Sequence, residues 1–221
     1  HFAGVIGWDA VNLSFAPYLT GMADRDVEQF AQMLIYEFSQ LTSARGGQAI
    51  FTDIHLNWEI PRSLADLPAI GPGGKPTGRT CGQYAAESQQ LARALMAVYR
   101  KGDAQGKPFI FPRPIIHITD EFFRTPGHEE FLQEVCAVAA EKGNPFFSLD
   151  RDGTVPASAR DVPGPGAGGA EATFRELWGR RWVSIQNVTL NLPRLGYRAG
   201  KDDQSLFALI AEKVALAAKA H

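Results

Sequence analysis

An alternation of amphipathic helical segments with short apolar runs constrains the fold of this chain more than any other feature. Apolar residues recur at intervals of three and four over residues 24–42, 84–100 and 203–220, and again after Thr125–Pro126. Short apolar runs typical of strands lie between these segments. The expected strands cover residues 49–54, 109–111, 115–118, 145–149 and 183–192. This order predicts an α/β fold with a largely parallel sheet.

Local signals predict where several of these helices begin and end. Asp24 is a candidate N-cap of the first helix. Thr125 is expected to cap the third, because the proline that follows it suits the first helical position. Gly102–Asp103 is expected to end the second helix. Residues 61–80 are rich in proline and glycine and predict a loop, whose Gly71–Lys75 stretch lacks the spacing of a phosphate-binding loop.

Prolines and glycines also mark two segments farther along the chain. Pro112 and Pro114 cannot donate to a strand ladder, so the run around them is expected to bend or to end near a sheet rim. Residues 150–172 have the composition of a mobile loop. Apart from that loop, residues 1–221 are expected to form a single domain.

Composition argues against several classes of function. The net charge of the chain is −2, so no basic excess points to nucleic acid as a partner. No run of about 18 apolar residues is present, so no membrane span is expected. The two cysteines, Cys81 and Cys136, share no metal spacing and suit a reducing cytoplasm. Cys136 lies on an apolar helical face, where a free cysteine usually acts as a small hydrophobe.

The histidines of the chain do not predict a metal site. Asp53 and His55 lie two apart on an expected strand and therefore share a face, but no third ligand is visible near them. His117 follows a bent strand and is interpreted as a core or rim residue. We therefore expect no bound metal.

A pair of glycines at a helix-to-strand turn provides the first candidate binding site. Gly46 and Gly47 could simply end the helix, because glycine permits a positive φ. They could also let the backbone approach a substrate, with Ser43, Arg45 and Gln48 supplying polar contacts. The residues themselves leave both readings open.

A second candidate lies beside the expected strand at 183–192, where Asn187, Asn191 and Arg194 gather. Buried asparagines need hydrogen-bond partners, so a structural role is one reading. The strand is expected to end at Pro193, and α/β folds place ligands at the carboxyl ends of strands, where Arg194 could face a phosphate. The helix start near Asp202 is another candidate anion site, although its acidic residues would repel an anion.

Three segments in order resemble one enzyme family. They are residues 43–54, residues 102–119 and residues 184–194, the last followed by Tyr197, Ala199 and Gly200. Together they resemble the anaerobic (class III, glycyl-radical) ribonucleoside-triphosphate reductases, in order and spacing over nearly the whole chain except residues 150–180.

The resemblance implies a fold, a reaction and a set of partners. The fold would be about half of a ten-stranded α/β barrel. The reaction would reduce ribonucleoside triphosphates to the deoxyribonucleotides used in DNA replication, through a thiyl radical generated by a stored glycyl radical. An iron–sulfur activase using S-adenosylmethionine makes that radical, so an activase, and a second copy or the missing barrel half, are expected partners in the cytoplasm. The residues expected to bind the nucleotide are Ser43, Arg45, Gly46, Gly47, Gln48, Asn187, Asn191 and Arg194.

The chain departs from the family pattern where the radical chemistry would occur. The family usually carries a cysteine loop between the segments that match Phe147 and Ser184, but this chain has no cysteine after Cys136. The glycyl-radical segment and a four-cysteine zinc site are also missing. We therefore assign no catalytic residue and no cofactor to this chain and expect it to be inactive alone. The alternative is a non-catalytic, degenerate barrel that binds a nucleotide or a partner protein.

Overall fold

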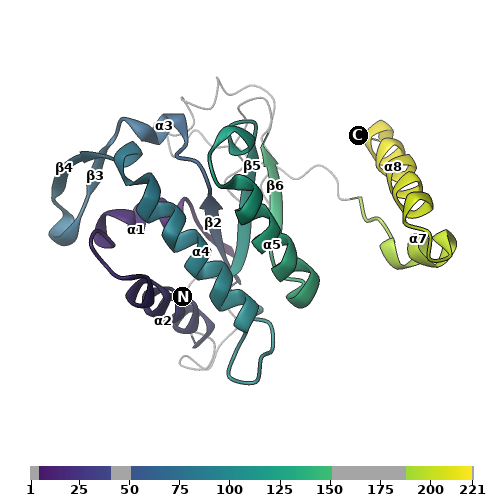
Figure 1. The fold of residues 1–221 in the computed structure, drawn as a ribbon, viewed down its shortest axis with the longest axis horizontal. Helices are drawn as coiled ribbons and strands as arrows, with labels where there is room; N and C mark the ends of the chain where they lie inside the picture. The colour runs from purple at the N-terminus through teal and green to yellow at the C-terminus, as the bar shows by residue number, and fades with distance from the viewer. Residues whose placement is uncertain (1–4, 41–50, 151–187, 221) are drawn as a thin grey trace. The chain divides into compact units, whose positions relative to one another are not determined.

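The computed structural model describes residues 5–40, 51–150 and 188–220 of the chain (Figure 1). These residues belong to two compact units. The first holds the two earlier ranges, and the second holds residues 188–220. The expected mobile loop at 150–172 lies outside the described residues except for Asp150, and the expectation of a single domain stays a prediction.

A parallel sheet of four strands forms the centre of the first unit. The strands are β1 (Val5–Trp8), β2 (Phe51–Asn57), β5 (Arg113–Thr119) and β6 (Phe146–Asp150). Their order is β1-β2-β5-β6, and each neighbouring pair is parallel. The predicted α/β fold with a parallel sheet is therefore confirmed.

Three long helices cover one face of this sheet (Figure 1). They are α2 (Asp24–Gln40), α4 (Ala85–Lys101) and α5 (His128–Lys142), and α4 packs against both of the others. Their apolar stripes meet alternate strand residues such as Ile54 and Ile116 in one core. Because side chains alternate across a strand, the residues between these core positions point to the opposite face of the sheet.

A short helix and a buried asparagine fasten the end of β2 to the helical layer. Helix α1 (Val11–Phe15) carries Asn12, whose Nδ2 donates to the carbonyl oxygen of Asn57 at 2.7 Å and to Ser88 Oγ at 2.7 Å. The backbone amide of Asn57 donates in return to Asn12 Oδ1 at 3.2 Å. The point where β2 ends is thus held by α1 and α4 together.

Helix α4 ends at Gly102, as the sequence predicted. Gly102 has φ 77° and ψ −164°, a conformation that is essentially restricted to glycine. A β-carbon at this position would lie 2.5 Å from the carbonyl oxygen of Lys107. The amide of Gly102 donates to the carbonyl oxygen of Val98 and completes the last turn.

The two predicted N-caps were wrong. Helix α2 begins at Asp24 itself, and the carbonyl oxygen of Ala23 accepts the amides of Asp26 and Val27. Helix α5 begins at His128, after Gly127 in the left-handed region. The hydroxyl of Thr125 donates to the carbonyl oxygen of Glu121, so it closes the preceding turn and does not cap α5.

The expected loop at 61–80 is a short helix followed by a β-hairpin. Helix α3 (Arg62–Ala65) leads into β3 (Pro68–Ile70), which pairs antiparallel with β4 (Pro76–Thr80). Glycines with positive φ lie in the 3₁₀ turn at Pro72–Gly74, which joins the strands. The loop prediction was wrong because a proline at the first position of a strand removes no essential ladder bond.

Two further expectations need correction. The strand expected at 109–111 is absent, since residues 109 and 110 have no regular structure and residues 111 and 112 form a bend. The bend expected around the prolines is therefore found, although Pro114 itself lies within β5, which pairs with both β2 and β6. Cys136 is exposed on α5 and does not belong to its buried face. The apolar residues around it suggested burial, but the core contacts of α5 come from Phe131, Val135 and Val138.

The second unit consists of α7 (Leu192–Ala199) and α8 (Asp203–Ala220), which pack together. The helix expected over 203–220 is confirmed. Residues 188–191 have no regular structure and Leu192 begins a helix, so the strand expected at 183–192 is wrong for its described part. Pro193 lies in the first turn of α7, where its fixed φ suits a helix. None of the described helices is long and apolar enough to cross a membrane.

Candidate functional site

The sheet face opposite the long helices carries a row of buried polar side chains. Asp53, His55 and Asn57 lie at alternate positions of β2, and all three are buried. The register places Asp53 beside Arg113 and Asn57 beside His117 of β5. His117 lies in turn beside Ser148 of β6. Three neighbouring strands therefore bring their polar residues onto a single face, which we call the polar face.

A buried ion pair lies at the amino-terminal end of the polar face. Arg113 Nε and Nη2 donate to Asp53 Oδ1 and Oδ2, each at 2.7 Å, in a two-pronged contact. The Asp53 carboxylate is fully buried, and the Arg113 guanidinium lies 5.2 Å from the centre of the Phe146 ring. Such paired contacts satisfy a carboxylate in both charge and geometry.

A chain of hydrogen bonds joins the three strands at the middle of the polar face. His55 Nδ1 lies 2.7 Å from His117 Nε2, and His117 Nδ1 contacts Asp150 Oδ2. Ser148 Oγ donates to Asp150 Oδ1 at 2.7 Å. His55, His117 and Asp150 are exposed by only 1%, 3% and 5%. We call these three residues the relay.

The direction of the relay depends on the charge of His117. An ionised Asp150 carboxylate can only accept, so His117 donates to it from Nδ1. A neutral His117 then accepts from His55 Nδ1 at its Nε2, whereas a charged His117 donates to His55 Nδ1. His55 Nε2 is buried and has no hydrogen-bond partner among the described residues.

Burial, together with the charges of His117 and Arg113, lowers the pKa of His55 from 6.5 to about 3. The ring is therefore neutral at physiological pH. A neutral imidazole can accept a hydrogen bond or a proton, whereas an imidazolium can do neither.

The lowered pKa of His55 predicts an acid-sensitive fold. Because the folded pKa lies below the unfolded value of 6.5, the unfolded chain binds more protons between the two values. This contribution to the free energy of unfolding is complete above about pH 6.5 and is lost as the pH falls toward about 3, by up to about 1.4 kcal/mol per pH unit. Urea denaturation from about pH 7.5 down to about pH 5 measures this slope.

His55→Asn is the matched control for the pH series, because its amide can still form a hydrogen bond with His117, as donor or acceptor, but cannot titrate. The free energy of unfolding of the wild type relative to this variant should fall as the solution is acidified. A relative stability that stays constant with pH would contradict the assignment. Glu59 contributes with the opposite sign in both proteins, because burial raises its pKa.

Two further unpartnered acceptors lie on the polar face or at its end. Asn57 Oδ1 and Glu59 Oε2 are buried and make no hydrogen bond with any described residue. Glu59 follows β2 directly, and its Oε1 accepts from Thr119 Oγ1 at 2.6 Å. The pKa of Glu59 also responds to the charges of His117 and Asp150, so its carboxyl lies near the relay. Buried polar groups without partners are rare in proteins and call for a water, an ion or a ligand.

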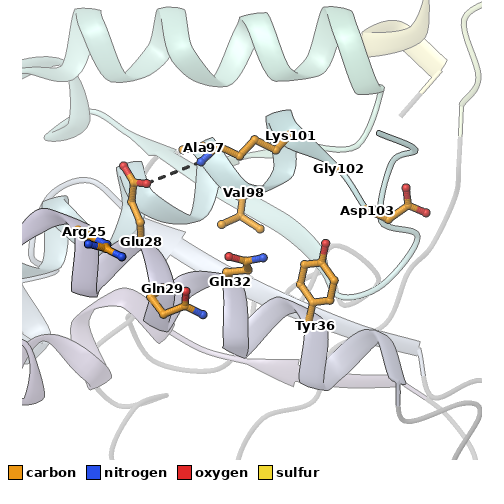
Figure 2. A pocket seen from close by; sticks show the side chains of 10 residues that line it. All are labelled: Arg25, Glu28, Gln29, Gln32, Tyr36, Ala97, Val98, Lys101, Gly102 and Asp103. Atoms are coloured by element: carbon orange, nitrogen blue, oxygen red, sulfur yellow. Dashed lines mark ion pairs between the residues drawn. The ribbon is translucent and has the colours of Figure 1, made fainter. Parts of the chain in front are cut away.

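A surface cavity between α2 and α4 is a weaker candidate (Figure 2). Its volume is about 290 Å³, and Arg25 and Gln32 of α2 line it. Lys101 pairs with Glu28 at 3.7 Å across the cavity. Asp103 is already bound by the amides of Gln105 and Lys107 at 2.9 and 2.8 Å. With both of its carboxylates engaged and its charges balanced, the cavity selects no particular ligand.

Most residues predicted to bind a nucleotide lie outside the described part of the chain. These are Ser43, Arg45, Gly46, Gly47, Gln48 and Asn187. Asn191 and Arg194 are described and lie together in the second unit. Asn191 Oδ1 accepts from the amide of Arg194 at 3.0 Å, so Asn191 caps α7 and Arg194 is exposed in its first turn. The cap is a structural role, and the binding role of both residues stays a prediction.

The other candidate anion site, at the start of α8, is internally satisfied. Asp202 Oδ2 accepts from the amide of Ser205 at 3.0 Å. A carboxylate therefore occupies the place that an anion would take, as the acidic residues suggested. Among the described residues, no group of three histidine, cysteine or acidic side chains could hold a metal ion.

Sequence reasoning did not find the relay. It placed Asp53 and His55 on one strand face and interpreted His117 as a lone residue. A usable signal was present in the sequence. Arg113 and His117 are polar residues four apart in the otherwise apolar strand β5, so they share one face of it. This is the face that also carries Asp53 and His55. Without the strand order, however, nothing indicated that β2 and β5 are neighbours.

Comparisons with known proteins identify one family. The model of the anaerobic ribonucleoside-triphosphate reductase family matches residues 1–221. No curated protein matches the chain.

Solved structures of the same kind of enzyme are also similar. The anaerobic ribonucleotide reductase from Thermotoga maritima, with citrate in the active site, is 15% identical, with 97% of this chain and 37% of that chain covered and a TM-score of 0.48. Its complex with dATP and CTP is 16% identical, with 97% and 35% covered and a TM-score of 0.49. A third anaerobic ribonucleotide reductase is 14% identical, with 97% and 33% covered and a TM-score of 0.43. The chain spans about a third of the length of these proteins.

Proposed function

This chain belongs to the anaerobic ribonucleoside-triphosphate reductase family, and we propose that it binds a ribonucleoside triphosphate for reduction to the deoxyribonucleotide. In this proposal its four parallel strands are part of a ten-stranded α/β barrel, and the polar face lines the interior. The product would supply DNA replication, and the place of action would be the cytoplasm.

One observation carries the proposal, namely the chemistry of the polar face. Parallel strands that are buried on both faces are usually apolar throughout. Here the face opposite the helices holds an ion pair, a three-residue relay and three buried polar atoms that have no partner among the described residues. Burying polar groups without partners costs free energy, which a bound ligand with matching groups would recover. A ligand site is therefore a better account of this face than a structural core.

The positions of the two thiols favour a binding function for this chain over radical chemistry. Burial raises the pKa of the Cys81 thiol, and Cys81 lies in the 3₁₀ turn at Cys81–Tyr84, outside the sheet. Cys136 is exposed on α5, a helix that covers the opposite face of the sheet from the relay. We therefore assign the radical thiol to neither, and we expect the 221-residue chain to bind the nucleotide without reducing it.

Partners would complete the reaction. An iron–sulfur activase that uses S-adenosylmethionine would make the glycyl radical. This radical, when present, would supply the oxidising equivalent. Among the described strands, β1 and β6 lie at the two edges of the sheet, and Phe147 and Leu149 of β6 are exposed. Unpaired strand edges favour pairing with another chain. A second copy or the remaining barrel half is the partner that we propose for these edges.

The nucleotide contacts predicted from the sequence remain part of the proposal. Arg194, exposed at the start of α7, would contact a phosphate, with Asn187 and Asn191 beside it. Ser43, Arg45, Gly46, Gly47 and Gln48 would contact the nucleotide from the turn before β2.

The alternative is a non-catalytic chain that binds a nucleotide or a partner and regulates it. The absence of a cysteine from the glycine- and proline-rich segment at 150–172 favours this alternative. Nucleotide binding is compatible with both functions, and only turnover in a completed reductase separates them.

Binding of the common ribonucleoside triphosphates to the purified chain tests the proposal directly, by isothermal titration. Arg194→Gln is expected to weaken binding about tenfold, because it removes a charge-assisted contact. Arg198→Gln is the matched control, since Arg198 is an exposed residue of the same helix and is expected to leave the affinity unchanged.

The titrations have clear outcomes. Saturable binding that Arg194→Gln weakens supports the proposal, whereas no binding of any ribonucleoside triphosphate overturns it. Assays with an activase, S-adenosylmethionine and formate should yield no deoxyribonucleotide from this chain alone. Turnover under those conditions would contradict the assignment of the radical thiol.

A further inference from the structure

We propose that Asn12 of α1 is a positioning residue for the nucleotide, because it holds the last residue of β2 and thereby sets where Asn57 and Glu59 meet the ligand. The inference deepens the proposed function and rests on it. Asn12 itself would not touch the ligand, since it is buried between β2 and α4 and acts through the main chain of β2.

The side chain of Asn12 replaces a strand partner at the end of β2. The register pairs β1 with β2 as far as Trp8 and Ile54, and residues 55–57 of β2 lie beyond the end of β1. Asn12 Oδ1 accepts from the amide of Asn57 at 3.2 Å, and Asn12 Nδ2 donates to the carbonyl oxygen of Asn57 at 2.7 Å. A carboxamide carries the same donor and acceptor as a peptide group, so it can continue the ladder where the strand has ended.

These contacts also fix the orientation of the Asn12 amide. A backbone amide can only donate and a carbonyl oxygen can only accept, so the two main-chain groups of Asn57 identify Oδ1 and Nδ2 of Asn12. On its other side, Nδ2 lies 2.7 Å from Ser88 Oγ and 3.2 Å from the carbonyl oxygen of Ser88. Asn12 is fully buried, so its removal would leave these groups without a partner.

The turn that brings Asn12 to this place is strained. Ala10, between β1 and α1, has φ 45° and ψ 46°, in the left-handed region that alanine rarely adopts. Such a conformation costs free energy and persists only where the surrounding contacts require it. The carbonyl oxygen of Ala10 accepts from the amide of Ser14 at 2.9 Å, so α1 starts directly after the turn and carries Asn12 to β2.

The side chains that Asn12 positions have free atoms at the carboxyl end of β2. Asn57 Oδ1 and Glu59 Oε2 are buried and have no hydrogen-bond partner among the described residues. Because one residue, Trp58, separates them, a shift of the main chain at Asn57 displaces both side chains. Glu59 also contacts the end of β5, where its Oε1 accepts from Thr119 Oγ1 at 2.6 Å. The carboxyl ends of parallel strands are where α/β folds place ligands.

Two substitutions compare buried asparagines at opposite ends of the sheet. Asn12→Ala removes both bonds to Asn57 and changes no residue of the polar face. Asn144→Ala is the matched control, because Asn144 is also buried and its Nδ2 also donates to a main-chain carbonyl, that of Phe109 at 2.9 Å. Asn144 precedes β6 at the amino end of the sheet, so its loss should leave the end of β2 in place. We expect both variants to fold and to unfold at lower urea concentrations than the wild type.

The first measurement is the pKa of the Glu59 carboxyl, followed in carbon-13 spectra without any nucleotide. Burial raises this pKa in the wild type. Asn12→Ala is expected to return it toward its ordinary value, because a released carboxyl moves toward water. Asn144→Ala should keep the wild-type value, since a loss of stability alone does not move this carboxyl. An unchanged Glu59 pKa in folded Asn12→Ala overturns the inference.

A measurement on the wild type covers the case in which Asn12→Ala does not fold. The Asn57 amide hydrogen is expected to exchange slowly with solvent, because Asn12 holds it as a strand would. Exchange at the rate of a free amide in the folded protein would show that the bond does not hold the end of β2, and it overturns the inference.

The second measurement is the affinity for the ribonucleoside triphosphates, by isothermal titration. Asn12→Ala is expected to weaken binding about tenfold, and Asn144→Ala by less than about twofold. Equal affinities of Asn12→Ala and the wild type overturn the inference and leave the proposed function intact. If the wild type binds no nucleotide, the proposed function fails and the role of Asn12 toward the nucleotide fails with it. In that case, a Glu59 pKa that changes in Asn12→Ala would show that Asn12 only orders the end of β2.

Discussion

Replacing Arg113 by alanine is expected to destabilise the fold by about 3–5 kcal/mol, one of the two largest single-residue effects that we predict. Asp53 is fully buried, and the structure shows both of its oxygens bound by this guanidinium at 2.7 Å. Without Arg113 the carboxylate would be an uncompensated buried charge, which must either remain ionised at high cost or take up a proton. Urea denaturation of both proteins near neutral pH measures the difference in free energy of unfolding.

A double variant tests whether the cost comes from the orphaned charge. Asp53→Leu combined with Arg113→Met replaces both partners by apolar groups, and such replacements are often neutral or stabilising. We expect the double variant to be more stable than Arg113→Ala by at least about 2 kcal/mol. A double variant that is as unstable as the single one would show that packing, and not charge, explains the loss.

The second large effect is expected at Trp58, where alanine should cost about 3–5 kcal/mol. Trp58 is only 2% exposed and stacks on Phe131, with ring centres 4.5 Å apart and planes at 15°. Its Nε1 donates to the carbonyl oxygen of Pro126 at 3.0 Å, and Arg93 lies over the ring. Truncation would leave a cavity between β2 and α5 and would remove the donor from that carbonyl.

Trp8→Ala is the matched control, because it removes the same side chain from an exposed position. Trp8 is 44% exposed and makes an edge-on contact with Phe38 at 5.3 Å. We expect its loss to cost less than half as much as the loss of Trp58. Denaturation curves with equal slopes would allow the two variants to be compared directly. Equal losses in the free energy of unfolding would contradict the assignment of Trp58 to the core.

Local patterns predicted the helical layer well. The apolar stripes of α2 and α4 were read from spacings of three and four, and buried residues such as Val27, Ile35 and Leu91 lie on those stripes. Gly102 was correctly placed at the end of α4 because its backbone conformation is a local property. Patterns of this kind depend on residues within a turn or two of one another, which the sequence contains directly.

The errors arose where the choice of hydrogen-bond partner decides the local structure. Residues 61–80 were expected to be a loop, yet β3 and β4 pair through prolines that tolerate an edge position. Thr125 was expected to cap α5, but its hydroxyl instead binds Glu121. In both places the residue types correctly indicated a flexible segment or a turn. They could not specify which group each residue would form a hydrogen bond with.

The candidate site was the least predictable part of the chain. The sequence identified the family through three ordered segments, and the family model confirms that assignment. It also placed Asp53 and His55 on one strand face. It did not pair Asp53 with Arg113 or His55 with His117, which lie 60 and 62 residues apart along the chain.

By itself, then, the sequence determined the fold class, the helical faces and the family, because periodicity and motif order are properties of neighbouring residues. Only the tertiary structure decided which charged groups meet. The strand order β1-β2-β5-β6 and its register bring Arg113, His117 and Asp150 to the same face as Asp53 and His55. A shift of one residue in that register would turn each of these side chains to the other face, so the site exists only once the sheet has formed.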